Sequence, residues 1–232
     1  MYSKDTSSTI LIVDDHPMIR AGLSLLLSAQ PDLVVCGECH EATAVLPSIE
    51  SLHPDLIVID ISLENSSGLT LIQDIKKKHK AQKMLAYSMH DEELFAVRAI
   101  QAGAMGYVEK KAHPRETIEA IRKILQGHMA VSQRVTDSLM SNMAGGRSDS
   151  GRTPLETLSS RELEVFELFG RGLSIREIAQ RLNRSTKTIE SHRERMMTKL
   201  GVVSSVRLVR QAVEWVTEHD HLLRARQPGD KA

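Results

Sequence analysis

Leu56-Ile57-Val58-Ile59-Asp60 is the stretch that decides the fold of the first part of this chain. Four consecutive apolar residues, most of them β-branched, fit a strand that is buried on both faces, as in a parallel sheet. The run stops on a carboxylate, so Asp60 lies at the carboxyl end of the predicted strand. Ligands of open α/β sheets bind outside these strand ends. Asp60 is therefore a candidate site residue, although an aspartate that only terminates a strand explains this stretch equally well.

The same pattern repeats on both sides of this strand. Ile10 to Val13 is a second apolar run that ends on Asp14 and Asp15, and Pro17 then suits the first turn of an amphipathic helix. Further strands are predicted at 33–38, 83–88 and 106–109, and further helices at 41–52, 69–78, 92–102 and 114–126. Strict alternation with short connections predicts an α/β domain with a five-stranded parallel sheet and helices on both faces.

Polar side chains collect at the carboxyl ends of the predicted strands. Asp14 and Asp15 follow the first strand, Asp60 ends the third, Ser88 ends the fourth and Lys110 follows the fifth. Three carboxylates would repel one another without a hard cation, and Mg²⁺ is typically held by carboxylates together with phosphate oxygens and water. A hydroxyl and an ammonium group suit the oxygens of a phosphoryl group. The pattern predicts an aspartyl-phosphate site with Asp60 as nucleophile and Mg²⁺ as cofactor.

Four segments resemble the receiver domain of bacterial two-component response regulators: Val13-Asp14-Asp15-His16, Asp60, Tyr87–His90 and Gly103–Lys110. The resemblance covers residues 9 to about 128 and implies a flavodoxin-like fold in which Asp60 accepts phosphate from a sensor histidine kinase. It implies that Mg²⁺ is surrounded by Asp14, Asp15, Asp60 and the carbonyl of Ser62. It also implies that the phosphate is sensed by Ser88, Tyr107 and Lys110. Leu63-Glu64-Asn65 departs from the Met-Pro-Gly that is frequent in this family, so the resemblance does not predict the shape of that loop.

The charge is unevenly distributed along a chain whose formal net charge is zero. Residues 1–130 hold 13 Lys and Arg against 17 Asp and Glu, whereas residues 131–232 hold 17 against 13. This asymmetry suggests cations as partners of the first part and a polyanion as partner of the second. The sequence has no signal peptide and no apolar run of about 18 residues, so we expect a cytoplasmic protein that does not bind membranes.

Cys36 and Cys39 form a C-x-x-C pair at the end of the predicted second strand. A structural zinc site needs four ligands, and no second Cys or His pair with suitable spacing is evident. A redox motif would be expected to open a helix. We therefore interpret both residues as small buried thiols.

A Gly- and Ser-rich segment separates the two parts of the chain. It follows a predicted helix at 132–142, and residues 144–154 show no periodicity, which predicts a flexible tether. We divide the chain into a receiver domain at 1–128, a linker helix and tether at 129–154, a DNA-binding domain at 155–220 and a disordered tail at 221–232.

Two capping boxes mark helix starts in the last domain, Ser159 with Glu162 and Ser174 with Glu177. They predict helices at 160–170 and 175–182, and a third helix starts after Ser185 and ends near residue 200. Polar residues fall on one face of this third helix and apolar residues on the other. Two helices joined by a short turn, the second with an exposed polar face, fit a helix-turn-helix.

Seven Lys and Arg residues lie between positions 176 and 199, which by itself also fits a solvated helix face. The segments Leu158–Val165, Gly172–Ala179, Thr188–Arg193 and Lys199–Val202 resemble the LuxR-type DNA-binding domain over about residues 155–217. A receiver joined to this domain resembles the NarL/FixJ subfamily of transcriptional regulators. The resemblance implies a small all-α domain of four helices that binds double-stranded DNA, with helix 185–200 in the major groove. The DNA-binding residues that it implies are Lys187, Thr188, Glu190, Ser191, Arg193, Glu194, Arg195 and Lys199.

The last predicted helix, at about 204–218, carries a stripe of four valines: Val206, Val209, Val213 and Val216. The resemblance places this helix at a dimer contact, so we expect a homodimer when the protein is phosphorylated. The stripe could equally belong to the core of the domain itself. Both interpretations stay open on the sequence alone.

Taken together, these patterns predict a phosphorylation-controlled transcriptional regulator that is not an enzyme beyond its own dephosphorylation, with RNA polymerase as a further candidate partner. One alternative is a phosphatase with Asp60 as nucleophile. Phosphatases that resemble haloacid dehalogenases usually carry Asp two residues later, and Ser62 in that position argues against this. The other alternative is a last domain that docks on protein, which salt-dependent binding to duplex DNA would distinguish.

Overall fold

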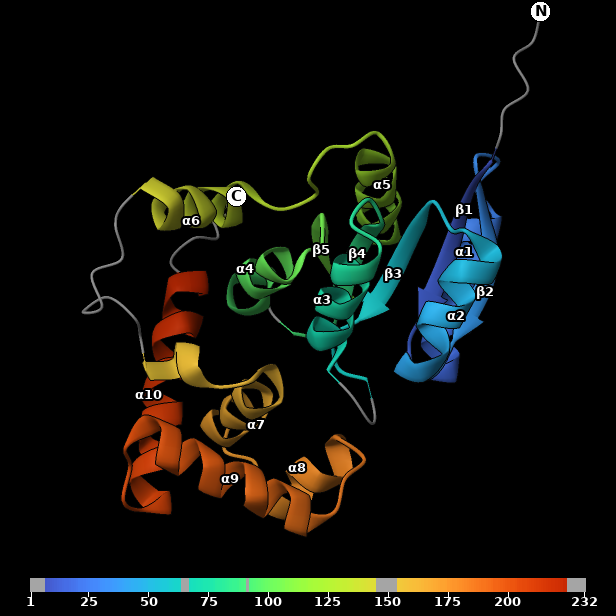
Figure 1. Ribbon diagram of the computed structural model, residues 1–232. Helices are drawn as coiled ribbons and strands as arrows, with labels where there is room; N and C mark the ends of the chain where they lie inside the picture. Colours follow the sequence, from blue (N-terminus) through green and yellow to red (C-terminus); the bar gives the residue numbers. More distant parts are fainter. Residues whose placement is uncertain (1–6, 64–66, 91, 145–153, 225–232) are drawn as a thin grey trace, which may run out of the picture. The chain divides into compact units, whose positions relative to one another are not determined.

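The computed structural model describes residues 7–63, 67–90, 92–144 and 154–224 and divides the chain into two compact units, Met1–Gly146 and Arg147–Ala232 (Figure 1). Most of the expected tether and residues 225–232 of the expected tail lie outside the described residues, as do Glu64 and Asn65 of the loop that departs from the family pattern. None of the described helices is long and apolar enough to cross a membrane.

The first unit is built on five parallel strands, as predicted. They are β1 (Ser8–Val13), β2 (Leu33–Cys39), β3 (Leu56–Asp60), β4 (Lys83–Ser88) and β5 (Gly106–Glu109). Their order is β2-β1-β3-β4-β5, which puts β3 in the centre. The strand order reverses between β1 and β3, because the chain adds β2 on one side of β1 and β3 on the other. Every residue of β3 is buried, in agreement with its uninterrupted apolar run.

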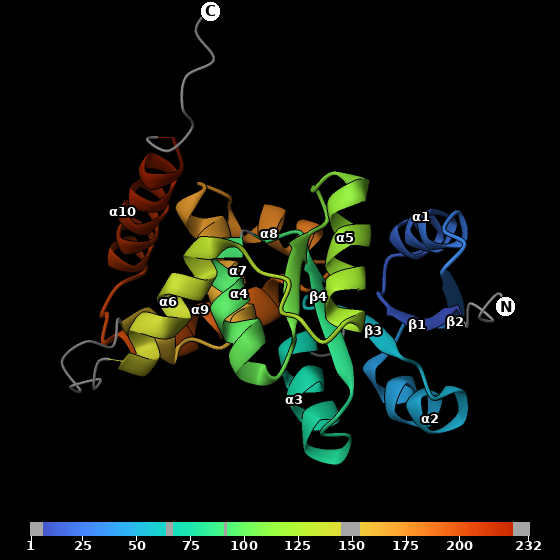
Figure 2. The same ribbon diagram turned by 90° about the horizontal axis from the view of Figure 1, so that it is seen from above.

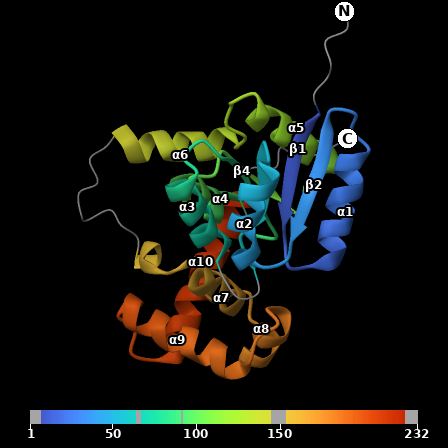
Figure 3. The ribbon, with the colours of Figure 1, turned by 45° about the vertical axis from the view of Figure 1, so that its right-hand side comes forward.

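Helices cover both faces of this sheet: α1 (Pro17–Ser28), α2 (Ala42–Leu52), α3 (Gly68–Lys78), α4 (Glu92–Ala102) and α5 (Pro114–Leu125). Figure 2 shows α1 and α5 on one side of the sheet and α2 and α3 on the other. Figure 3 shows α1 running alongside β2. Alternate strand residues such as Ile10 and Ile12 form one buried cluster with Leu27 of α1 and Ile121 of α5, because side chains of a strand point to opposite faces in turn.

The segment after α5 returns to the edge of β5. Tyr107 N donates to Ala130 O at 3.0 Å, and Ala130 N donates to Met105 O at 2.9 Å. This pairing needs Gly106, because a Cβ on that residue would lie 2.7 Å from the carbonyl oxygen of Ala130. The chain then forms α6 (Gln133–Ala144), which packs against α4 and buries Val135.

The two cysteines are free thiols of different exposure. Cys39 is buried, as expected, and its Sγ lies 3.3 Å from Ser48 Oγ. Cys36 is only half-buried. It is the residue skipped where the pairing of β1 with β2 shifts register, since Ile10 pairs with Val35 and Leu11 pairs with Gly37.

The second unit is helical, with the 3₁₀ turn η2 (Pro154–Thr157) before α7 (Ser160–Gly170), α8 (Ile175–Arg181), α9 (Thr186–Leu200) and α10 (Ser205–Arg224). Both predicted capping boxes form, each with reciprocal hydrogen bonds between the Ser and the Glu three residues later. The expected end of the last helix, near Glu218, is too early. Because α10 continues to Arg224, residues 221–224 of the expected tail are helical.

Candidate functional site

Asp14, Asp15 and Asp60 meet at the carboxyl ends of β1 and β3, where the strand order reverses. One oxygen from each carboxylate and one ring nitrogen of His16 all lie within 4.8 Å of one another. Asp14 and Asp60 are each only 2% exposed. The sheet therefore concentrates three acidic groups where water screens their charges poorly.

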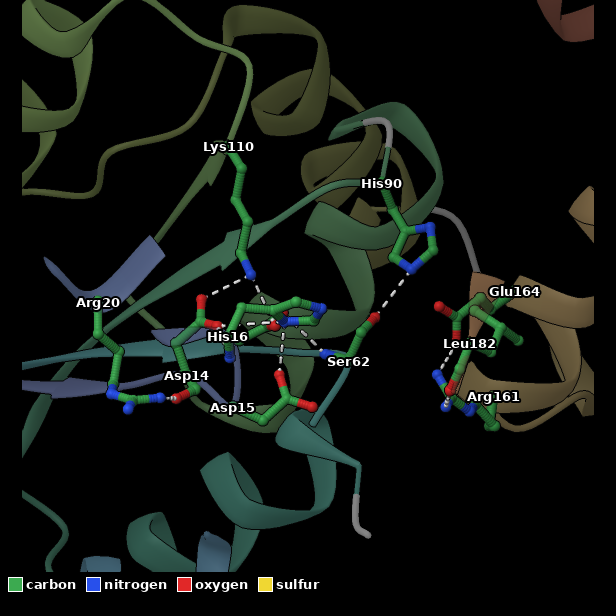
Figure 4. Close-up of polar contacts among 11 residues, drawn as sticks. Asp14, Asp15, His16, Arg20, Ser62, His90, Lys110, Arg161, Glu164 and Leu182 are labelled. Atoms are coloured by element: carbon green, nitrogen blue, oxygen red, sulfur yellow. Dashed lines mark hydrogen bonds and ion pairs between the residues drawn. The ribbon is translucent and has the colours of Figure 1, made fainter. Parts of the chain in front are cut away.

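Lys110 lies between two of these carboxylates (Figure 4). Its Nζ is 2.6 Å from Asp14 Oδ2 and 2.7 Å from Asp60 Oδ2, and the side chain is 2% exposed. Burial would lower the pKa of Lys110, but Asp60 and Asp14 outweigh burial and raise it. Burial also raises the pKa of the Asp60 carboxyl, an effect that Lys110 opposes. Lys110 therefore stays an ammonium ion and holds the carboxyl group of Asp60 in a fixed position.

The cluster presents carboxylate oxygens that could bind a hard cation. Asp14 Oδ2 and Asp15 Oδ1 are buried, and neither accepts a well-aligned hydrogen bond from the described residues, although Lys110 and His16 approach them at 2.6 and 2.8 Å. One ammonium group does not balance three carboxylates. Clustered carboxylate oxygens of this kind are the ligands that Mg²⁺ prefers.

Ser62, which follows Asp60, contacts the cluster through its backbone. Ser62 N donates to Asp60 Oδ1 at 2.9 Å. This bond and the one from Lys110 engage both carboxylate oxygens of Asp60. The position of the Asp60 side chain is therefore set from two sides.

Ser88 is the last residue of β4 and Tyr107 lies in β5, and both contact His90 in the loop that follows β4. Ser88 is fully buried, its Oγ accepts a hydrogen bond from His90 N at 3.1 Å, and its carbonyl accepts one from Lys110 N at 2.6 Å. Tyr107 is 3% exposed and its hydroxyl donates to His90 O at 2.9 Å. Both predicted switch residues therefore bind His90, while Lys110 links this loop to Asp60.

His90 and Arg20 are site residues that the sequence patterns do not single out. His90 Nε2 lies 2.9 Å from Ser62 Oγ (Figure 4), and the ring stacks on Phe95 at a centroid distance of 4.5 Å. Arg20 donates from Nη1 to Asp14 O at 2.7 Å. The sequence signal for His90 was only its place two residues after Ser88, because Ser62 and Phe95, which contact its ring, come from other elements.

In the second unit, α9 carries the predicted DNA-binding residues on its solvent side. Ile189 and Met196 are fully buried and fix this orientation. Exposed side chains belong to Lys187, Glu190, Glu194 and Arg195, and half-buried ones to Thr188, Ser191 and Arg193. Thr188 also helps to start the helix, because its N–H donates to Ser185 Oγ at 3.1 Å. The exposed face of α9 therefore presents both cations and carboxylates.

Lys199, at the end of α9, is already paired. Its Nζ lies 2.6 Å from Glu162 Oε2, and Glu162 is 3% exposed. The same carboxylate oxygen accepts a hydrogen bond from Ser159 N at 2.7 Å. Burial raises the pKa of Glu162, but Lys199 and Ser159 outweigh burial and lower it. The capping box signalled the bond between Glu162 and Ser159, but no local pattern signals a partner that is 37 residues away.

Both units match known families. Residues 10–122 match the family described as response regulator receiver domain, and residues 156–212 match the luxR family of bacterial regulatory proteins. The nitrate/nitrite response regulator protein NarL of Escherichia coli (strain K12) is 31% identical over 214 residues, which are 92% of this chain and 97% of NarL. The oxygen regulatory protein NreC of Staphylococcus aureus (strain JH9) is 32% identical over 209 residues, with coverage of 88% and 96%.

Solved structures of RcsB, one of them from Salmonella enterica serovar Typhimurium in complex with the promoter rprA, are similar along most of the chain. RcsB bound to the promoter rprA in the presence of the phosphomimetic BeF₃⁻ has a TM-score of 0.56 at 29% identity, with 88% of this chain and 98% of RcsB covered. Two RcsB dimers bound to two parallel DNAs give 0.54 at 27% identity, with coverage of 88% and 97%. Each of these matches covers at least 88% of this chain.

Proposed function

Because this chain belongs to the NarL/FixJ subfamily of response regulators, with a receiver domain followed by a LuxR-type DNA-binding domain, we propose that phosphorylation of Asp60 by a sensor histidine kinase controls its binding to specific double-stranded DNA. The observation that carries the proposal is the buried contact of Lys110 with Asp14 and Asp60 where the strand order reverses. Binding of one duplex before and after modification of Asp60 tests both halves of the proposal.

The chemistry is a phosphoryl transfer from histidine to carboxylate. An oxygen of Asp60 attacks the phosphorus of a phosphohistidine, and the P–N bond breaks as the new P–O bond forms. Lys110 then pairs with an oxygen of the acyl phosphate. Mg²⁺ held by Asp14, Asp15, Asp60 and the carbonyl of Ser62 would neutralise part of the phosphoryl charge. Attack by water on phosphorus later restores the carboxylate, so the protein dephosphorylates itself and needs no external substrate.

Ser88 and Tyr107 are the proposed sensors of the acyl phosphate. The Ser88 hydroxyl accepts a hydrogen bond from His90 N and can donate its own hydrogen to a phosphoryl oxygen. A move of Ser88 toward the phosphate would pull on His90, whose carbonyl holds the Tyr107 hydroxyl. A shift at the phosphoryl group could thereby be transmitted to β5 and α4 through the hydrogen-bonded residues Ser88, His90 and Tyr107.

We predict that Mg²⁺ stabilises the receiver domain through these carboxylates. At a free Mg²⁺ concentration of about 100 times Kd, the free energy of unfolding should rise by about 2.7 kcal/mol. Asp15→Asn removes one oxygen ligand and should lose most of this gain, whereas Asp74→Asn, a change on the exposed side of α3, should keep it. Thermal unfolding with and without Mg²⁺ measures the difference, and equal gains in both variants would contradict the site.

The exposed face of α9 is the proposed DNA contact, and its residues divide by charge. Lys187, Arg193 and Arg195 can neutralise phosphates, which fixes the register of the protein but carries no sequence information. Glu190, Ser191 and Glu194 occupy the base-facing positions of the family by resemblance. An acidic side chain near a polyanion needs a donor, and the N4 amine of cytosine is the major-groove donor that suits it.

We expect Glu190→Ala to relax preference at one base pair by about 1 to 3 kcal/mol and to leave the salt dependence of binding nearly unchanged. Arg195→Ala should instead weaken binding to all sequences and lower the salt slope by about one. Lys199→Ala is the matched comparison, because the charge of Lys199 is already paired with Glu162 and should contribute little to the slope. Selection of sites from random duplexes decides the first point, and identical preferences for wild type and Glu190→Ala would rule out base reading.

A further inference from the structure

The carboxylates of Glu109, which precedes Lys110, and of Glu92 form a chain of hydrogen bonds that reaches the linker helix α6. Glu109 Oε1 accepts a hydrogen bond from Glu92 N, the first residue of α4, at 2.9 Å. Glu92 Oε1 in turn accepts one from Ser132 N at 3.0 Å. The second oxygen of Glu109 is 2.9 Å from Lys111 Nζ, an ion pair that helps to orient this carboxylate. One chain of contacts therefore runs from the end of β5 through the start of α4 to the start of α6.

Ser132 immediately precedes α6 and caps its first turn. Thr136 N and Thr136 Oγ1 both donate to Ser132 O at 3.1 Å, and Val135 N donates to Ser132 Oγ at 3.4 Å. Val135 is 2% exposed because α6 packs against α4. The carboxylate of Glu92 thus fixes the first turn of α6 at the place where that helix meets α4. A bond from a charged acceptor to a backbone N–H is among the stronger hydrogen bonds in proteins.

The upstream end of this chain touches the proposed phosphoacceptor site. Lys110, next to Glu109, contacts Asp60 through Nζ and the carbonyl of Ser88 through its backbone N–H. Tyr107 is tied to His90 by its hydroxyl and to Ala130 by its backbone N–H. A shift of Lys110 or Ser88 toward a phosphoryl group must therefore move Glu109, the start of α4, or both.

We propose that Glu92 is a positioning residue that couples the phosphoacceptor site to the linker helix, by holding α6 against α4 until a shift of Glu109 releases it. This inference rests on the proposed function, because it takes the acyl phosphate at Asp60 as the trigger. The structure links each step by a hydrogen bond or, between Lys110 and Glu109, by the backbone, and α6 is the last helix before the connection to the DNA-binding domain. Release of α6 lengthens that connection without any change in the receiver core.

Hydrogen exchange of the full-length protein tests the coupling. Backbone amides of residues 135–140 are followed in wild type, Glu92→Ala and Glu92→Gln, each with Mg²⁺ alone and with Mg²⁺ and beryllium fluoride. In wild type, beryllium fluoride should speed this exchange about tenfold. Glu92→Ala should show the faster exchange already with Mg²⁺ alone, and Glu92→Gln, whose amide oxygen still accepts from Ser132 N, should behave as wild type.

A second variant tests the upstream link. Glu109→Ala removes the acceptor of Glu92 N and should leave the exchange of α6 insensitive to beryllium fluoride. Amides of β1 and β3 serve as the internal control for global destabilisation, and exchange there should not differ from wild type in any variant. Wild-type exchange of α6 in Glu92→Ala overturns the inference.

The same experiment separates failure of the coupling from failure of the proposed function. Binding of beryllium fluoride to Asp60 is detected independently by slower exchange of Ser62 N, which already donates to Asp60 Oδ1. Absence of this protection contradicts the proposed phosphoacceptor. Protection at Ser62 without faster exchange of α6 contradicts only the coupling through Glu92.

Discussion

Asp60→Asn is expected to abolish the covalent phosphoryl group completely. Incubation of the intact protein with acetyl phosphate and Mg²⁺ should add about 80 Da to wild type, the mass of one phosphoryl group on a side chain. The amide of Asn cannot form an acyl phosphate. Of the other two carboxylates in the cluster, Asp14 is already bound by Lys110 Nζ and by His16 N and so should not replace Asp60 as acceptor. Mass spectrometry of the intact protein measures the presence or absence of this adduct directly.

Two comparisons make this test specific. Asp74→Asn changes an exposed carboxylate of α3 and should still take the group. Omission of Mg²⁺ should suppress the adduct in wild type. A full adduct in Asp60→Asn would show that another residue is the phosphoacceptor, and the assignment of Asp60 would be wrong.

Val206→Asp is expected to weaken binding to a full operator by about 100-fold and to leave binding to a single half-site unchanged. A dimer binds its second half-site at a high effective concentration, which raises affinity by about that factor, and the substitution should prevent the dimer from forming. The structure divides the valine stripe of α10. Val216 is 7% exposed and lies in the core with Leu208 and Ala212, whereas Val206 is 79% and Val213 41% exposed. Val206 and Val213 are seven residues apart on one helix and so lie on the same face. We propose that this exposed face forms a two-fold contact between two copies of the chain.

Gln211→Asp is the matched control for this prediction, because it adds the same charge to an exposed position on a different face of α10. Its affinity for the full operator should stay close to wild type. Operators should contain half-sites about one helical turn apart, or roughly 34 to 36 Å. Sedimentation at saturation should find two protomers on the full operator, and a single protomer would refute the dimer.

The strands and helices of the first unit could be predicted because their signals are local. The run from Leu56 to Ile59 is apolar without interruption, and the strand is buried on both faces. At the starts of α7 and α8, each capping Ser bonds to the Glu three residues later, so the contact can be read from the local sequence. The end of α10 was predicted too early, because no Gly or Pro follows Glu218 within the helix, which continues to Arg224.

The contacts that join separate elements could not be predicted in this way. Strand alternation placed Asp14, Asp60 and Lys110 at one edge, but it could not show that Lys110 touches both carboxylates. The pair of Glu162 with Lys199 joins two helices whose packing decides the contact. The bond from Ser132 to Glu92 spans 40 residues and depends on how α6 packs on α4. Each of these pairs follows from the tertiary arrangement and not from a local pattern.

The central claim is that modification of Asp60 controls DNA binding. Its most direct test is the affinity of the full-length protein for one selected duplex at fixed salt, before and after incubation with acetyl phosphate and Mg²⁺, in wild type and in Asp60→Asn. We predict that the affinity of wild type rises by about 5- to 150-fold, the usual range of coupling between two sites, and that Asp60→Asn does not respond. The same affinity for wild type before and after modification, with the phosphoryl group present by mass, would contradict the account.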